Sequence, residues 1–65
     1  MVKTVHTDKH GDEMTIYSPE GSKLIFIDGI FDDHKIAWRG IYTPDGAREI
    51  AKRLNDLADI MEGKQ

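Results

Sequence analysis

TPDGAREIAKRLNDLADIMEG, residues 43–63, is the stretch that decides the fold, because it marks both ends of a helix. Thr43 is a good N-cap, since its hydroxyl can accept a hydrogen bond from one of the first unpaired N–H groups. Pro44 stands at the first helical position, where its missing N–H costs nothing. Gly63 is placed to adopt the left-handed conformation just past the C-terminus. The sequence therefore predicts one helix between Thr43 and Gly63.

Apolar side chains recur along this helix at the spacing of a single face. Positions i, i+3, i+4 and i+7 fall within an arc of about 120°, the width typical of a stripe that faces a core. This apolar stripe consists of Ala47, Ile50, Ala51, Leu54, Leu57, Ala58 and Met61. Ile60 lies outside it, on the polar flank. The pattern is too short for a clear coiled-coil seam, so it favours an amphipathic helix that packs on a sheet.

Three segments before the helix have the pattern of strands. Glu13–Ser18 alternates between apolar and polar residues, and the turn signal Ser18-Pro19-Glu20-Gly21 follows it. Ser22–Ile27 is apolar on both faces, which is typical of a central strand. Ile36–Tyr42 is the third segment and leads directly into the helix. These elements predict a β-meander in which neighbouring strands are antiparallel.

The dipeptide Asp28-Gly29 is open to two interpretations. We favour a β-bulge, because Ile30 and Phe31 continue the apolar character and a better loop follows at Asp32–Lys35. The alternative is a wide loop that runs from Asp28 to Lys35.

The first twelve residues are polar, and we interpret residues 1–12 as a mobile arm with Val2–His6 as a candidate edge strand. His6, Asp8, His10 and Asp12 alternate in this segment as the ligands of a transition-metal site could. A flexible arm supplies no second shell to orient such ligands, so we favour a solvated tail and predict no metal site.

The predicted fold is therefore α+β: a three-stranded antiparallel β-meander followed by one C-terminal amphipathic helix, with residues 13–65 as a single domain.

Such a sheet has two faces, and one helix covers only one of them. Alternation within the strands suggests two apolar sets. One set is Ile25, Ile27, Ala37 and Ile41, and the other is Leu24, Phe26, Ile36, Trp38 and Tyr42. We expect a homodimer in which the second face or the helix end meets its twin, with contacts at Ile25, Ile27, Ile41 and Ile60. The competing interpretation is that this surface binds another molecule.

Composition limits the classes of function. The chain has 65 residues, no cysteine and a net charge of −3, which argues against non-specific binding of nucleic acid. No apolar run is long enough to span a membrane, and the N-terminus lacks the apolar region of a signal peptide. We therefore expect a cytoplasmic protein.

No catalytic motif stands out, so we expect a non-enzymatic protein without a cofactor. Ser18 and Ser22 have no obvious base nearby. His34 beside Asp32 and Asp33 is the best acid–base cluster, but a hairpin tip lacks the desolvation that tunes such groups. The spacing of a calcium-binding loop is absent as well.

Trp38, Arg39 and Tyr42 are the candidate residues for binding a ligand or partner, since aromatic residues and arginine are enriched at binding hot spots. Trp38 is also open to a second interpretation, as a core residue beneath the helix.

The run IFIDGIFDDHKIAWRGIYTPDGAREIAKRLNDLAD, residues 25–59, resembles short phage and prophage accessory proteins. In these, a strand pair ends in a Thr-Pro-x-Gly-Ala start to an amphipathic helix. The resemblance covers about half of the chain. It implies a phage-type accessory protein in the host cytoplasm that binds and inhibits a host or defence protein. The alternative is a dimer that sequesters a small signalling nucleotide in a pocket with Trp38, Arg39 and Tyr42.

Overall fold

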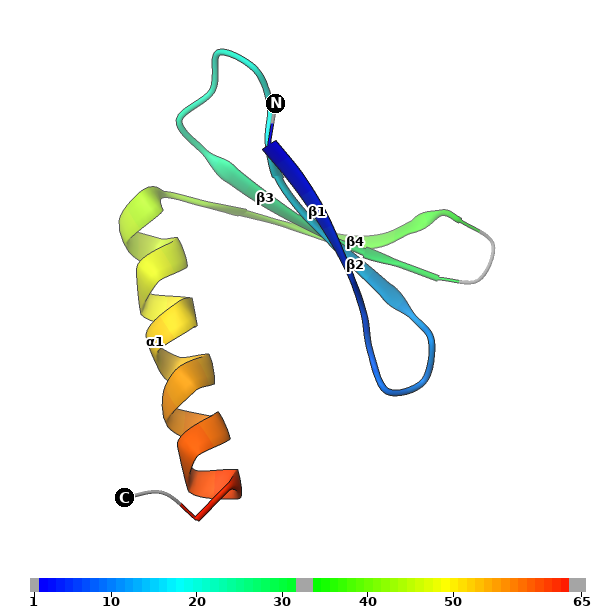
Figure 1. Ribbon diagram of the computed structural model, residues 1–65. Coiled ribbons are helices and arrows are strands. Elements are labelled where there is room, and N and C mark those ends of the chain that lie inside the picture. The colour runs from blue at the N-terminus through cyan, green and yellow to red at the C-terminus, as the bar shows by residue number, and fades with distance from the viewer. Residues whose placement is uncertain (1, 32–33, 64–65) are drawn as a thin grey trace.

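The computed structural model describes residues 2–31 and 34–63, which form four strands and one helix (Figure 1). The strands are β1 (Val2–Thr7), β2 (Glu13–Ser18), β3 (Ile25–Ile30) and β4 (Ile36–Tyr42), and the helix is α1 (Pro44–Met61). The strands lie in the order β1-β2-β3-β4, each antiparallel to its neighbour. The predicted α+β class and the meander followed by one helix are thus confirmed, with four strands in place of three.

The fourth strand is the candidate edge strand at the N-terminus. Val2–Thr7 pairs with β2 along its whole length, so the candidate edge strand at Val2–His6 is present and extends by one residue. The turn that closes this hairpin has a clear cause. Asp8 Oδ1 accepts hydrogen bonds from the backbone N–H groups of His10 at 2.8 Å and Asp12 at 3.0 Å, and Gly11 has a φ of 92°. An Asp followed three residues later by Gly is a turn signal that could have predicted this hairpin.

The second predicted strand is displaced along the chain. The turn between β2 and β3 closes where the Ser22 N–H donates to the Pro19 carbonyl at 3.0 Å. Ser18 Oγ then donates to the Leu24 carbonyl at 2.9 Å, so residues 22–24 belong to the connection. β3 therefore begins at Ile25 and continues to Ile30, and the alternative of a wide loop that starts at Asp28 is wrong.

The bulge lies where it was predicted, but on the opposite strand. Gly29 pairs with Trp38 and Ile30 pairs with Ile36, so the register shifts by one residue and Ala37 of β4 is the extra residue. A bulge of this kind increases the local twist and bends the strand that carries the extra residue.

The register also decides which side chains share a face, because directly paired residues point to the same side. The helix-side face carries Met14, Ile16, Ile25, Ile27, Trp38 and Tyr42; the open face carries Thr15, Tyr17, Phe26, Asp28, Ile30, Ile36, Arg39 and Ile41. The prediction that Ile25 and Ile27 share a face with Ile41 is therefore wrong. So is the grouping of Phe26 with Trp38. Alternation within one strand does not reveal the register between strands.

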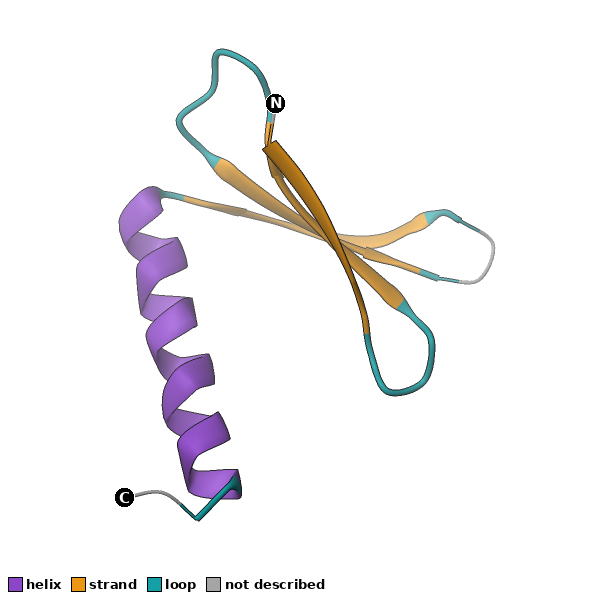
Figure 2. Ribbon diagram, in the orientation of Figure 1, coloured by secondary structure: helices purple, strands orange, loops and turns teal. Residues whose placement is uncertain are grey.

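The helix has the predicted ends, but it leans away from the sheet (Figure 2). Thr43 Oγ1 accepts from the Gly46 N–H at 3.1 Å, and Gly63 has a φ of 79°. Its first turns lie beside the end of β4, and its C-terminal half extends past the sheet. Among the described residues, no apolar side chain is buried; the buried residues are Thr15, Asp28 and Gly29. The expected core beneath the apolar stripe is therefore not closed within one chain.

Gly29 is a position where a side chain has no room, because the indole of Trp38 lies where its Cβ would stand. We expect Gly29→Ala to lower the free energy of unfolding by about 1–3 kcal/mol, the usual cost of overpacking. Urea denaturation checks this, and Trp38→Ala is the control background. There the cost of Gly29→Ala is expected to fall sharply, and an equal cost in both backgrounds would mean that the indole is not the cause.

Candidate functional site

The open face is centred on Asp28, a carboxylate in the middle of an otherwise apolar strand. Its side chain is 6% exposed. Arg39 Nε donates to Oδ1 at 2.8 Å and Arg39 Nη2 donates to Oδ2 at 3.1 Å. The Tyr17 hydroxyl also donates to Oδ2, at 3.0 Å. The sheet register places these groups together, because Asp28 pairs with Thr15 on one side and with Arg39 on the other.

The Phe26 ring lies beside Tyr17 and Arg39, the two side chains that donate hydrogen bonds to Asp28. The rings of Tyr17 and Phe26 lie 5.4 Å apart, at an interplanar angle of 36°. The Arg39 guanidinium carbon lies 5.7 Å from the centre of the Phe26 ring, within the range of a cation–π contact. The ion pair with Asp28 and the contact with the Phe26 ring together hold Arg39 in one orientation on the surface of the sheet.

The same contacts shift the pKa values of Asp28, Tyr17 and Arg39. Hydrogen bonds from Arg39 lower the pKa of Asp28 against the opposing effect of burial, and the Tyr17 hydrogen bond lowers it further. Desolvation raises the pKa of the Tyr17 phenol, and its hydrogen bond to Asp28 adds to the shift. The Asp28 carboxylate raises the pKa of Arg39. Asp28 is thus a weak base with both oxygens engaged, an arrangement suited to holding Arg39 in place.

Exposed apolar side chains surround this cluster. Ile36 is 49% exposed and Ile41 is 54% exposed. A shallow cavity of about 340 Å³ lies between the polar and apolar parts, lined by Lys3, Thr15, Tyr17, Asp28, Ile30, Ile36 and Arg39. The open face therefore combines a fixed arginine, a tyrosine and aliphatic side chains on one surface.

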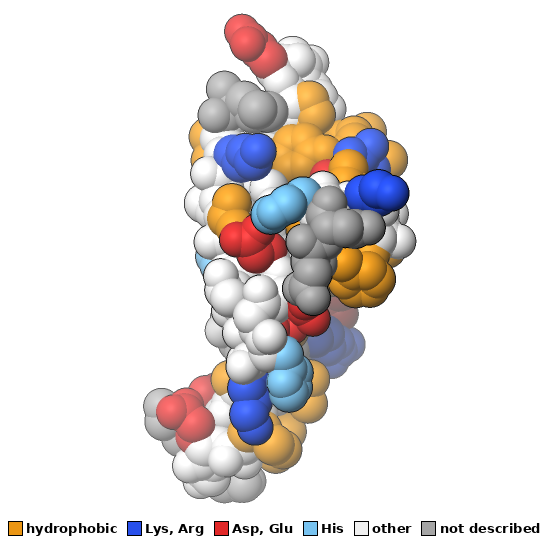
Figure 3. Space-filling view, turned by 90° about the vertical axis from the view of Figure 1, so that its right-hand side faces the viewer, with side chains coloured by type: hydrophobic (Ala, Val, Ile, Leu, Met, Phe, Trp, Pro, Cys, Tyr) orange, Lys and Arg blue, Asp and Glu red, His pale blue; other side chains and the backbone are white. Residues whose placement is uncertain are grey.

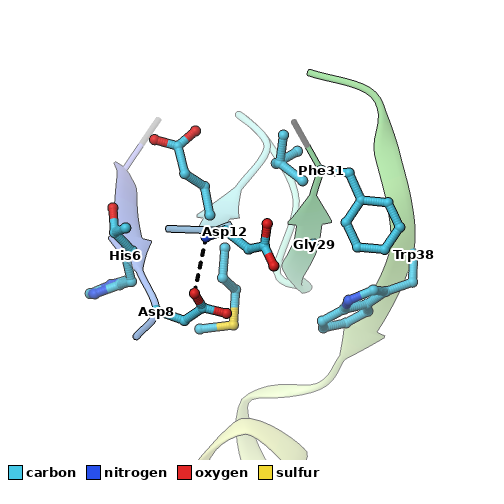
Figure 4. A pocket seen from close by; sticks show the side chains of 10 residues that line it. His6, Asp8, Asp12, Gly29, Phe31 and Trp38 are labelled. Atoms are coloured by element: carbon cyan, nitrogen blue, oxygen red, sulfur yellow. Dashed lines mark hydrogen bonds between the residues drawn. The ribbon is translucent and has the colours of Figure 1, made fainter. Parts of the chain in front are cut away.

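A second cavity, of about 320 Å³, lies near the β1–β2 hairpin (Figure 4). His6, Asp8 and Asp12 stand on one side of it, and Phe31 and Trp38 stand on the other. The Asp8 carboxylate accepts the two backbone hydrogen bonds of the hairpin turn, and His6 Nε2 lies 3.1 Å from Thr4 Oγ1. Within residues 2–31 and 34–63, no three His, Asp or Glu side chains gather as metal ligands would. Asp32 and Asp33 of the predicted acid–base cluster lie outside the described residues.

A third and larger cavity is the groove between α1 and the helix-side face. Its volume is about 510 Å³, and most of its lining is apolar. The sheet contributes Met14, Ile16, Ile25, Ile27, Trp38 and Tyr42, and the helix contributes Ala47, Ile50, Ala51 and Leu54. Figure 3 shows that apolar side chains also reach the surface on the side of the hairpin loops, among charged ones.

The structure separates the residues that the sequence grouped for binding. Trp38 and Tyr42 line the groove on the helix side, whereas Arg39 belongs to the open face. Of the predicted dimer contacts, Ile25 and Ile27 line the groove and Ile41 lies on the open face. Ile60, on α1, is 58% exposed. Their role in a dimer stays a prediction.

Sequence reasoning missed Tyr17 and Asp28. A carboxylate within IFIDGI, the sequence of β3, was the available signal, because a charged residue in the interior of an apolar strand requires a partner.

Comparisons with known proteins add no further constraint. A scan against protein-family models, a search of curated proteins and a search of solved structures each found no match. In the part of the chain that the structure describes, no helix combines the length and apolar character needed to cross a bilayer. The surfaces of the molecule are therefore the guide to its function.

Proposed function

We propose that this chain is a small non-enzymatic interaction protein that binds a protein partner through its open face. The observation that carries the proposal is the cluster of Arg39, Asp28 and Tyr17, which three hydrogen bonds hold together beside the exposed Ile36 and Ile41. Arginine and tyrosine are enriched at the energetic centres of protein interfaces, where apolar neighbours exclude water. Asp28 orients Arg39 before binding, so little side-chain freedom is lost when a partner docks.

The resemblance of residues 25–59 to phage and prophage accessory proteins supports a more specific proposal. In it, the partner is a host or defence protein, which this chain inhibits in the host cytoplasm.

The alternative function, a dimer that sequesters a signalling nucleotide, receives less support from the geometry. Trp38 and Tyr42 lie on one face of the sheet and Arg39 lies on the other. All three can line one pocket only if two subunits contribute to it.

The proposal predicts that Ile41→Glu weakens capture of the partner by about tenfold or more, because the change places a charge in a desolvated interface. The measurement is affinity capture with quantitative mass spectrometry. Lys52→Glu, on the polar side of α1, is the control and is expected to leave capture unchanged. Equal recovery with Ile41→Glu and wild type would contradict the proposal. A small molecule released from the purified protein by heat would favour the alternative.

A further inference from the structure

The groove between α1 and the sheet is an apolar surface that one chain leaves open. Leu54 is 62% exposed, Leu57 is 56% exposed and Met61 is 77% exposed, although all three belong to the apolar stripe. On the sheet side of the groove, Trp38 is 48% exposed. Both walls of the groove therefore present apolar side chains to solvent.

A single chain gains too little from burial in this state. Complete burial of a Leu, Ile or Met side chain contributes about 1.5–3 kcal/mol, and small domains depend on several such residues. None of the described apolar side chains is buried in one chain. Something that covers the groove and the stripe together would therefore add the burial that one chain lacks.

We propose that α1 of a second copy of this chain fills the groove, with the two helices antiparallel about a two-fold axis. The shape of the surfaces supports this occupant. Each chain has an uncovered apolar groove and an uncovered apolar helix surface, the C-terminal half of α1. In a two-fold symmetric dimer, the helix of each chain can cover the groove of the other, so the contact is isologous. The 18 residues of α1 span about 27 Å, comparable to the roughly 23 Å of a seven-residue strand.

The charges on α1 support the antiparallel orientation. Residues 45–53 include Arg48, Lys52 and Arg53 and have a net charge of +1, whereas residues 54–62 carry only acidic charges and have a net charge of −3. Acidic residues near a helix C-terminus interact unfavourably with the helix dipole. Antiparallel packing places the basic half of each helix beside the acidic half of the other, and with the axis near Asn55 it brings Arg48 close to Glu62 of the partner subunit.

This arrangement moves the dimer contact away from some residues that the sequence suggested. Leu54 and Leu57 lie near its centre and Met61 lies toward its end, where these side chains meet the apolar lining of the groove, while Ile60 lies at the margin. Ile41 stays outside the contact, on the open face. The dimer and the proposed partner-binding surface can therefore be tested separately.

Sedimentation equilibrium at micromolar concentration is the first test, with the wild type expected to be a dimer. Leu57→Asp is expected to raise the dissociation constant by about 100-fold or more, because it would bury an unpaired charge. Ile41→Glu is the matched control, since Ile41 is 54% exposed and Leu57 is 56% exposed. It is expected to leave the dimer unchanged, whatever it does to partner capture. A monomeric wild type with an intact helix by circular dichroism would overturn the proposal and leave the groove to another partner.

A second test does not depend on the folding of Leu57→Asp. The chain has no cysteine, so Asn55→Cys introduces a single thiol near the proposed axis. A short bis-maleimide is expected to link the Asn55→Cys chains into covalent dimers, whereas Glu20→Cys, in the β2–β3 turn, is expected to stay uncoupled. Arg48→Glu alone is expected to weaken the dimer, and the double change Arg48→Glu with Glu62→Arg is expected to restore it. Coupling at Glu20→Cys but not at Asn55→Cys, or a charge exchange that restores nothing, would overturn the antiparallel arrangement.

Discussion

Replacement of Asp28 with alanine is expected to lower the free energy of unfolding by about 1–3 kcal/mol, because the change removes a partly buried ion pair with Arg39 together with a hydrogen bond from Tyr17. Urea denaturation measures the loss. Asp28→Asn keeps the size of the side chain and is expected to cost less. Asp45→Ala removes an ion pair with Arg48 in which both side chains are exposed, and it is expected to have a much smaller effect than Asp28→Ala. Similar losses for Asp28→Ala and Asp45→Ala would show that the cluster does not hold the sheet together.

The same carboxylate predicts how stability depends on pH. Hydrogen bonds from Arg39 lower the pKa of Asp28 in the folded protein below its usual value of 3.8. A depressed folded pKa means that the contribution of Asp28 to stability is complete above the unfolded pKa. It is lost as the pH falls from about 4 through the folded pKa. Denaturation profiles of the wild type are expected to show this acid loss, and those of Asp28→Asn are expected to lack this part of it.

Leu54→Ala distinguishes a covered groove from an open one. In one chain Leu54 is 62% exposed, so its truncation would lower the free energy of unfolding by much less than truncation of a core leucine does. If the second copy covers it, the loss is expected to be about 2–5 kcal/mol, as for a buried leucine. Thermal or urea unfolding at several protein concentrations checks this, because the stability of a dimer depends on concentration and that of a monomer does not.

Leu24→Ala is the control for this prediction. Leu24 is 40% exposed and lies in the connection before β3, outside the groove and the stripe. Its truncation is expected to have a small effect that does not change with concentration. A loss at Leu54 below about 0.5 kcal/mol would contradict coverage of the stripe, since even a partly buried leucine contributes more.

Local signals predicted local structure well. Thr43, Pro44 and Gly63 marked the helix ends correctly, because capping depends on backbone groups within one turn. β2 and β4 were predicted with their observed bounds. β3 was misplaced by three residues, because its apolar run extends through Asp28-Gly29, where a turn signal and a bulge look alike in sequence.

The sequence by itself determined the class of fold, the amphipathic helix and the absence of disulfides, since each follows from residue types and spacing along the chain. Only the tertiary structure decided which strands' side chains meet. The register placed Arg39 on Asp28 and made Ala37 the bulged residue. The tertiary structure also decided that α1 diverges from the sheet and leaves a groove. These outcomes depend on contacts between residues distant in the chain, and alternation within a single strand carries no information about its neighbour's register.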